Sequence, residues 1–214
     1  MNRIMNVDSP VMRFLSSFAD LIVVNLLLIL FSLPIITAGA AVTAALRVTR
    51  DIMNDEASHM VRSFWNAFRE NFRQATAVWI PQAIVLLGLC YNFYLFQFLL
   101  DDGNYRKSLV LLVVLLVVVV GAGVYLYMLI ESFHNTLGEH LKNALAMFFH
   151  YLPISVMLAC LNAVPAVLFV LSPYLFLQTF VLWAGFGFAL ICLLDNLMLR
   201  SAFQKLRKRA EQSS

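Results

Sequence analysis

The sequence predicts an all-α, polytopic membrane protein: a bundle of about five transmembrane helices forming a single membrane domain over residues 1–214. Of the 214 residues, 62% are hydrophobic and 13% are charged, whereas soluble domains are about 45–50% apolar and about 25% charged. The charged residues gather in a few segments, and four long stretches between them contain none. One polar segment also occurs twice, each time just before an apolar run. These observations exclude an ordinary soluble domain.

The uncharged stretches predict the membrane spans. They run from Asp20 to Arg47, Arg73 to Asp101, Lys107 to Glu131, and Lys142 to Asp195. A span needs about 20 mostly apolar residues, so the first three stretches hold one span each and the last holds two. Ser172-Pro173 is the expected turn within the last, because proline cannot continue a helix. The predicted spans are 18–44, 75–99, 108–130, 144–169 and 175–198.

Basic residues in short loops predict the orientation, because such loops stay in the cytoplasm. Five spans place the two ends on opposite faces. One face would carry the loops 47–73 and 131–142 and the tail 200–214, which together hold eleven of the 15 Lys and Arg residues. We therefore expect an external amino terminus and a cytoplasmic basic tail. The net charge of +3 suits an anionic inner leaflet rather than nucleic acid.

The duplicated segment predicts an internal repeat. Ser63 to Ala77 reads S-F-W-N-A-F-R-E-N-F-R-Q-A-T-A, and Ser132 to Ala146 reads S-F-H-N-T-L-G-E-H-L-K-N-A-L-A. Each copy leads directly into an apolar run. We expect a parallel repeat in which each unit is a span, a cytoplasmic amphipathic helix and a second span.

The first copy carries an aromatic stripe. Phe64, Phe68 and Phe72 are spaced four residues apart, with Trp65 beside them, and the charged residues lie largely off this stripe. Such a helix suits either the bilayer interface or a docking surface for a cytoplasmic partner, and both interpretations stay open. The candidate contacts in the two copies are Phe64, Trp65, Phe68, Arg69, Glu70, Phe72, Arg73, Glu139 and Lys142.

Few residues suggest chemistry. Glu131 and His134 have the spacing of one ligand pair in a di-iron bundle, but such a site needs that motif twice. We therefore expect no metal and no cofactor. No nucleophile elbow, Walker loop or zinc-protease pattern occurs, so an enzyme is not expected. Asp20 and Asp195 are expected near membrane boundaries, which leaves no charge at a span centre and argues against a proton-driven pump.

Small residues predict close helix packing. Gly39 and Thr43 form one of several i, i+4 pairs near the inner end of the first span, and small residues let helix backbones approach in lipid. The neighbouring helix could belong to this chain or to another copy, so a homo-oligomer is possible. The candidate packing residues are Asn25, Pro34, Gly39 and Thr43.

Two runs resemble the YesL-like family of bacterial integral membrane proteins, itself a domain of unknown function. They are N-L-L-L-I-L-F-S-L-P-I-I-T-A-G-A-A-V-T-A-A-L at 25–46 and F-W-N-A-F-R-E-N-F-R-Q-A-T at 64–76. Asn135-Thr136-Leu137 and 142–145 fit the same pattern. The resemblance implies the bacterial cytoplasmic membrane and, because family members are often encoded beside carbohydrate importers, a link to sugar uptake.

The functional expectation combines this resemblance with the duplicated helix. We expect a non-enzymatic accessory subunit that contacts a carbohydrate ABC permease or its ATPase through the amphipathic helices. Two alternatives remain open: a self-sufficient channel or facilitator for small solutes, and a membrane-bound sensor.

Overall fold

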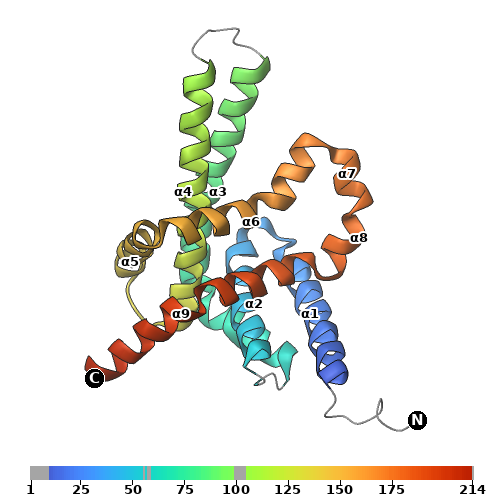
Figure 1. Ribbon diagram of the computed structural model, residues 1–214, viewed down its shortest axis with the longest axis vertical. Coiled ribbons are helices and arrows are strands. Elements are labelled where there is room, and N and C mark those ends of the chain that lie inside the picture. The colour runs from blue at the N-terminus through green and yellow to red at the C-terminus, as the bar shows by residue number, and fades with distance from the viewer. Residues whose placement is uncertain (1–9, 55, 57–58, 99–104, 214) are drawn as a thin grey trace.

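The computed structural model describes residues 10–54, 56, 59–98 and 105–213, and over these residues the chain is helical, without strands (Figure 1). Five helices of the described part are long and apolar enough to cross a membrane, which makes the chain a multi-pass membrane protein. The main helices are α1 (Pro10–Ser32), α2 (Ala38–Met53), α3 (Met60–Phe98), α4 (Tyr105–Ser132), α5 (Leu137–His150), α6 (Leu152–Leu171), α7 (Pro173–Gln178), α8 (Phe180–Leu182) and α9 (Phe188–Ser213).

Pro34 divides the first predicted span, 18–44, into two helices. Helix α1 ends at Ser32, a short 3₁₀ turn follows at Ile35–Thr37, and α2 then returns beside α1 as the second arm of a hairpin (Figure 1). Proline disfavours a helical residue before it and has no N–H to donate. The amino-terminal end of α1 therefore lies at the same end of the hairpin as the end of α2. The predicted span 18–44 is therefore not one continuous helix, and its candidate membrane-crossing part is Leu15–Ser32 of α1.

Helix α2 is the buried centre of the protein. It packs against α1, α3, α4 and α9, and its alanines at 40, 41, 44 and 45 are fully buried. Its 16 residues extend only about 24 Å, less than the hydrocarbon core of about 30 Å. Because α2 is enclosed by the other helices, it does not need the length of a membrane span.

Helix α3 joins the first amphipathic segment to the second predicted span without a break. Its 39 residues extend about 58 Å, so the amphipathic helix expected within the loop 47–73 and the span expected at 75–99 form one continuous helix. Helices α3 and α4 form a long hairpin whose far end stands apart from the other helices (Figure 1). Gln82 joins its arms, donating to the Val119 carbonyl at 3.1 Å and accepting from the Tyr127 hydroxyl at 2.5 Å.

The second copy of the duplicated segment is built differently. Helix α4 ends at Ser132, residues 133–136 are not helical, and α5 begins after Thr136. A further break at Tyr151 separates α5 from α6, where Pro153 occupies the first turn, a position that suits proline. The predicted span 144–169 thus begins too early, and the apolar window is Leu152–Phe169. One copy is continuous and the other is interrupted twice, so the internal repeat is not confirmed in three dimensions.

The last predicted span, 175–198, is irregular at its start. Helices α7 and α8 are short, residues Trp183–Gly187 form a π-helical segment, and α9 then continues to Ser213. The predicted tail 200–214 is therefore helical through Ser213. The apolar window is Phe180–Gln204. Helices α6 and α9 cross the α3–α4 hairpin obliquely (Figure 1).

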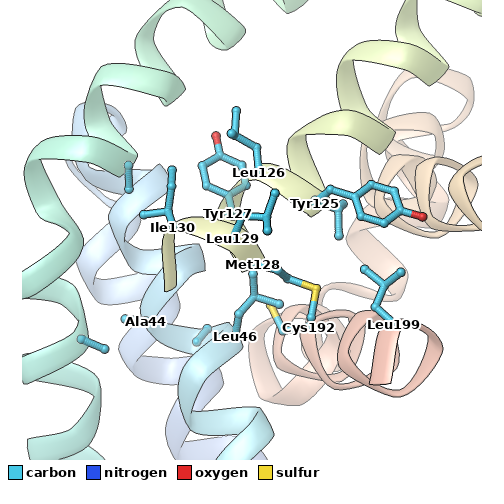
Figure 2. Packing of buried hydrophobic residues seen from close by; sticks show 14 of the residues in the cluster. Ala44, Leu46, Tyr125, Leu126, Tyr127, Met128, Leu129, Ile130, Cys192 and Leu199 are labelled. Atoms are coloured by element: carbon cyan, nitrogen blue, oxygen red, sulfur yellow. The ribbon is translucent and has the colours of Figure 1, made fainter. Parts of the chain in front are cut away.

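The core lies where α2, α4 and α9 meet. Figure 2 shows Met128 and Leu129 of α4 beside Leu46 of α2 and Cys192 of α9. Every residue from Gly121 to Ile130 is buried, so this half of α4 is enclosed on all sides. The core therefore ends at Glu131, where the charged groups begin.

Candidate functional site

An arginine–carboxylate cluster joins the end of α4 to α2. The Arg50 guanidinium donates to both carboxylate oxygens of Glu131, with Nη2 to Oε1 at 2.5 Å, and donates through Nη1 to the Ser132 hydroxyl at 3.1 Å. Arg47 Nε lies 4.0 Å from Glu131 Oε1. The Glu131 side chain is only 3% exposed. Two arginines from adjacent turns of α2 therefore hold one buried carboxylate.

Helix α3 is tied into the same cluster. Arg47 Nη1 donates to Glu70 Oε2 at 3.0 Å, and the Glu70 side chain is 56% exposed. Nearby, the Ser63 hydroxyl donates to Asp51 Oδ2 at 3.2 Å. Burial raises the pKa of Asp51, and the positive charge of Arg50 opposes that rise. The ends of α2, α3 and α4 are thus fixed to one another by charged groups.

From the sequence, Arg47 and Arg50 were predicted only to be basic residues of a cytoplasmic loop, and no ion pair was predicted for them. Their i, i+3 spacing places Arg47 and Arg50 on one face of a helix, and this was the available signal. Their partner Glu131 is 81 residues away from Arg50, so the pairing itself depends on the fold. Glu131, which has the spacing of a metal ligand pair with His134, forms an ion pair with Arg50. Among the described residues, no group of three potential metal ligands occurs.

A cavity of about 80 Å³ opens beside this cluster, between α2, α4 and α9. Its polar wall consists of Arg50, Asn54, Ser132, Asn196, Arg200 and Gln204. Its apolar wall consists of Met53, Met128 and Phe203. The Asn196 amide closes the inner side, donating to the Leu46 carbonyl at 2.8 Å and to the Thr49 hydroxyl at 3.0 Å.

The predicted contact stripe on α3 is divided between the core and the surface. Phe64 and Phe68 are buried and contact the Phe31 ring of α1, with ring centroids 5.5 Å and 5.0 Å apart. They support the helix from inside and present no surface to a partner. Trp65 is 48% exposed and Phe72 is 39% exposed. The predicted contacts that reach the surface of α3 are Trp65, Arg69, Glu70, Phe72 and Arg73.

The predicted contacts on α5 have separate roles. Glu139 and Thr136 form a capping box, in which the Thr136 amide donates to Glu139 Oε2 at 3.0 Å and the Glu139 amide donates to the Thr136 hydroxyl at 3.4 Å. Hydrogen bonds to its carboxylate from the Thr136 amide and then the Thr136 hydroxyl lower the pKa of Glu139. Lys142 is exposed. Glu139 thus caps the start of α5, whereas its counterpart Glu70 lies inside α3 and makes an ion pair with Arg47 of α2.

Of the predicted packing residues, Asn25, Gly39 and Thr43 are buried at internal contacts, whereas Pro34 is exposed in the turn between α1 and α2. The Asn25 amide donates to the carbonyls of Trp183 and Ala184 at 3.0 Å and 2.7 Å, and its oxygen accepts from the Ala189 N–H at 2.9 Å. The side chain of Asn25 therefore caps the irregular start of α9. The neighbour that this side chain meets belongs to the same chain.

Gly39 lies at a close approach of α2 to α3. A Cβ at this position would lie 2.6 Å from Trp79 Cβ and 2.8 Å from the Ala75 carbonyl oxygen. Thr43, one turn later, is buried and donates its hydroxyl to the Gly39 carbonyl at 2.8 Å. These small residues therefore pack within one chain.

Asp195 is buried against α6. It is 2% exposed, and the Asn162 amide donates to both of its carboxylate oxygens at 3.0 Å and 3.1 Å. This pair joins α6 to α9.

Comparison with known proteins places one part of the chain. Residues 21–93 are similar to a family described as a protein of unknown function, DUF624. This region contains most of α1, all of α2 and most of α3, including both arginines of the cluster and the exposed face of α3. No curated protein and no solved structure matches the chain. The similarity carries no activity, substrate or partner.

Proposed function

We propose that this protein is a non-enzymatic accessory subunit that docks onto a carbohydrate ABC importer through the outer face of α3. One observation carries the proposal: α3 presents Trp65, Arg69 and Arg73, together with Phe72, on exposed positions of consecutive turns. The sugar importer as partner rests on the resemblance to the YesL-like family.

The opposite face of α3 supports this role by holding the helix rigid. Phe64, Ala67 and Ala75 are fully buried, and Glu70 is bonded to Arg47 of α2. A surface displayed on a fixed helix loses little conformational entropy when a partner binds. The exposed face of α3 therefore suits a stable contact with a partner protein.

The chemistry of the face supports a protein partner over lipid. Trp and Arg are the residues most enriched at the energetic centres of protein interfaces. Helix α5 differs, because Leu137, Leu141, Leu145 and Phe149 are exposed along it. Such an aliphatic stripe suits the acyl boundary of a bilayer. The two copies of the repeat would then divide the tasks: α3 for the partner and α5 for the membrane.

The proposal includes an orientation. The start of α3 and the basic end of α9 face the cytoplasm, as their Lys and Arg content favours. Because α1 and α2 form a hairpin, the amino terminus lies on the same side. An amino-terminal tag should therefore be protected from external protease in intact cells, and cleavage of that tag from outside would contradict this orientation.

The test is co-purification at native expression level in mild detergent. The unaltered chain should recover importer permease or ATPase subunits, and R69E/R73E should lose them while still inserting into the membrane. Lys142→Glu is the matched control, since it reverses an exposed charge on α5 and should keep the partner. Equal recovery from both variants would contradict docking on α3. Recovery of the unaltered chain alone, as a defined oligomer, would instead favour a channel or facilitator.

A further inference from the structure

The cavity between α2, α4 and α9 has an unbalanced charge. Two arginines line it, Arg50 and Arg200, and no carboxylate does. Glu131, the partner of Arg50, is almost completely buried and is not part of the cavity wall. Arg200 makes no ion pair within the described residues. The charge of Arg50 is compensated by Glu131 behind the wall, so Arg200 is the cationic side chain of the lining that has no carboxylate partner within the described residues.

The neutral polar groups of the wall add to this preference. Asn54 and Gln204 bring amide donors from α2 and α9, and Ser132 brings a hydroxyl from α4. Ser132 already accepts a hydrogen bond from Arg50, so its own hydroxyl proton is directed elsewhere, to Glu131 Oε2 at 2.9 Å. The Asn54 and Gln204 amides, the Arg200 guanidinium and those Arg50 N–H groups that are not bonded to Glu131 or Ser132 remain as the donors available to a ligand.

We propose that this cavity binds a phosphate group. Guanidinium groups match phosphate geometry with paired hydrogen bonds, and a tetrahedral phosphate offers oxygens to arginines on two walls at once. A planar carboxylate, with two oxygens, serves one guanidinium well but not two. The volume of about 80 Å³ exceeds the share of two liquid water molecules, about 30 Å³ each.

The apolar wall indicates what the phosphate is attached to. Met53, Met128 and Phe203 line the cavity beside the arginines, so a carbon-bearing substituent has a surface to contact. Two sources share this chemistry: a soluble phosphate compound from the cytoplasm, and the headgroup of an anionic phospholipid. In either case the bound phosphate joins Arg50 of α2 to Arg200 of α9 and so holds α9 against the core.

The experiment uses the purified full-length chain in lipid nanodiscs and follows thermal unfolding. One arm titrates inorganic phosphate into phosphatidylcholine nanodiscs, with chloride at matched ionic strength as the reference. The other arm compares phosphatidylcholine with phosphatidylcholine–phosphatidylglycerol mixtures. Stabilisation by free phosphate identifies the soluble source, and stabilisation by phosphatidylglycerol alone identifies the lipid.

The variants decide whether this cavity is responsible. Arg200→Gln should weaken phosphate binding, or the midpoint of the phosphatidylglycerol effect, about tenfold, the loss expected for one charge-assisted contact. Arg200→Lys keeps the charge and should lose less, which guards against a folding defect in the first variant. Arg62→Gln removes an exposed arginine elsewhere and should leave both responses unchanged.

Equal responses of Arg200→Gln and the unaltered chain in both arms would overturn the proposal, as would no response of the unaltered chain to either probe. No importer subunit is present in this experiment, so its outcome is independent of docking on α3.

Discussion

Glu131→Gln should destabilise the protein more than removal of Glu70, the other carboxylate that pairs with the arginines of α2. The carboxylate is 3% exposed and bonds Arg50 through both oxygens. Removing one partner of a buried ion pair costs about 3–5 kcal/mol. The Arg50 side chain is 22% exposed, so water replaces part of the lost interaction and we expect about 2–3 kcal/mol. For a chain of this size that lowers the melting temperature by about 4–12 °C.

Glu70→Gln is the matched control. It removes the same charge from the same network, but its side chain is 56% exposed, and exposed pairs contribute about 0–1 kcal/mol. Both variants would be purified in one detergent and compared by thermal unfolding. The double variant of Arg50→Gln with Glu131→Gln should cost less than the sum of its parts, because the two groups act as a pair. Equal melting temperatures for Glu131→Gln and Glu70→Gln would refute the reasoning.

Three further changes test single contacts by the same melting measurement. Asn25→Leu should cost about 1–3 kcal/mol, because two carbonyls at the start of α9 lose their donor, whereas Asn92→Leu, at an exposed site, should cost little. Gly39→Ala should cost about 1–3 kcal/mol by forcing α2 from α3, whereas Gly88→Ala, with open space around it, should not destabilise. Asp51→Asn should leave stability unchanged or raise it at neutral pH, because burial raises the pKa of this carboxyl. The pKa of Asp51 is higher in the folded than in the unfolded chain, so the unaltered chain should become more stable relative to Asp51→Asn as pH falls through the folded pKa. An increase of its relative stability with rising pH would contradict a raised pKa.

The long apolar helices could be predicted from the sequence, but the α1–α2 hairpin was not. The physics that ends a helix at Pro173 applies equally at Pro34. What concealed the break was the composition of α2, whose small apolar residues continue the uncharged stretch. An uncharged stretch indicates which residues avoid water, and a short helix buried in the protein avoids water as well as a membrane span does.

The duplicated segment shows how identical residues acquire different roles. Glu70 and Glu139 occupy equivalent positions in the two copies, yet one bonds Arg47 and the other caps α5. The difference follows from position 136, where the second copy has threonine, a strong helix cap, and the first has Ala67. Phe64 and Phe68 were expected at a surface because their spacing forms a stripe. Which side of an amphipathic helix meets the core depends on Phe31 of α1, a contact between distant parts of the chain.

The docking face of α3 is the central claim, and photo-crosslinking in living cells tests it most directly. A photoreactive amino acid would replace Arg69, at the centre of the exposed face, and in a second variant Gly88, in the apolar part of the same helix. The account predicts a covalent adduct with an importer permease or ATPase subunit from position 69 and none from position 88. Adducts with lipid alone at position 69, or the same products from both positions, would contradict it.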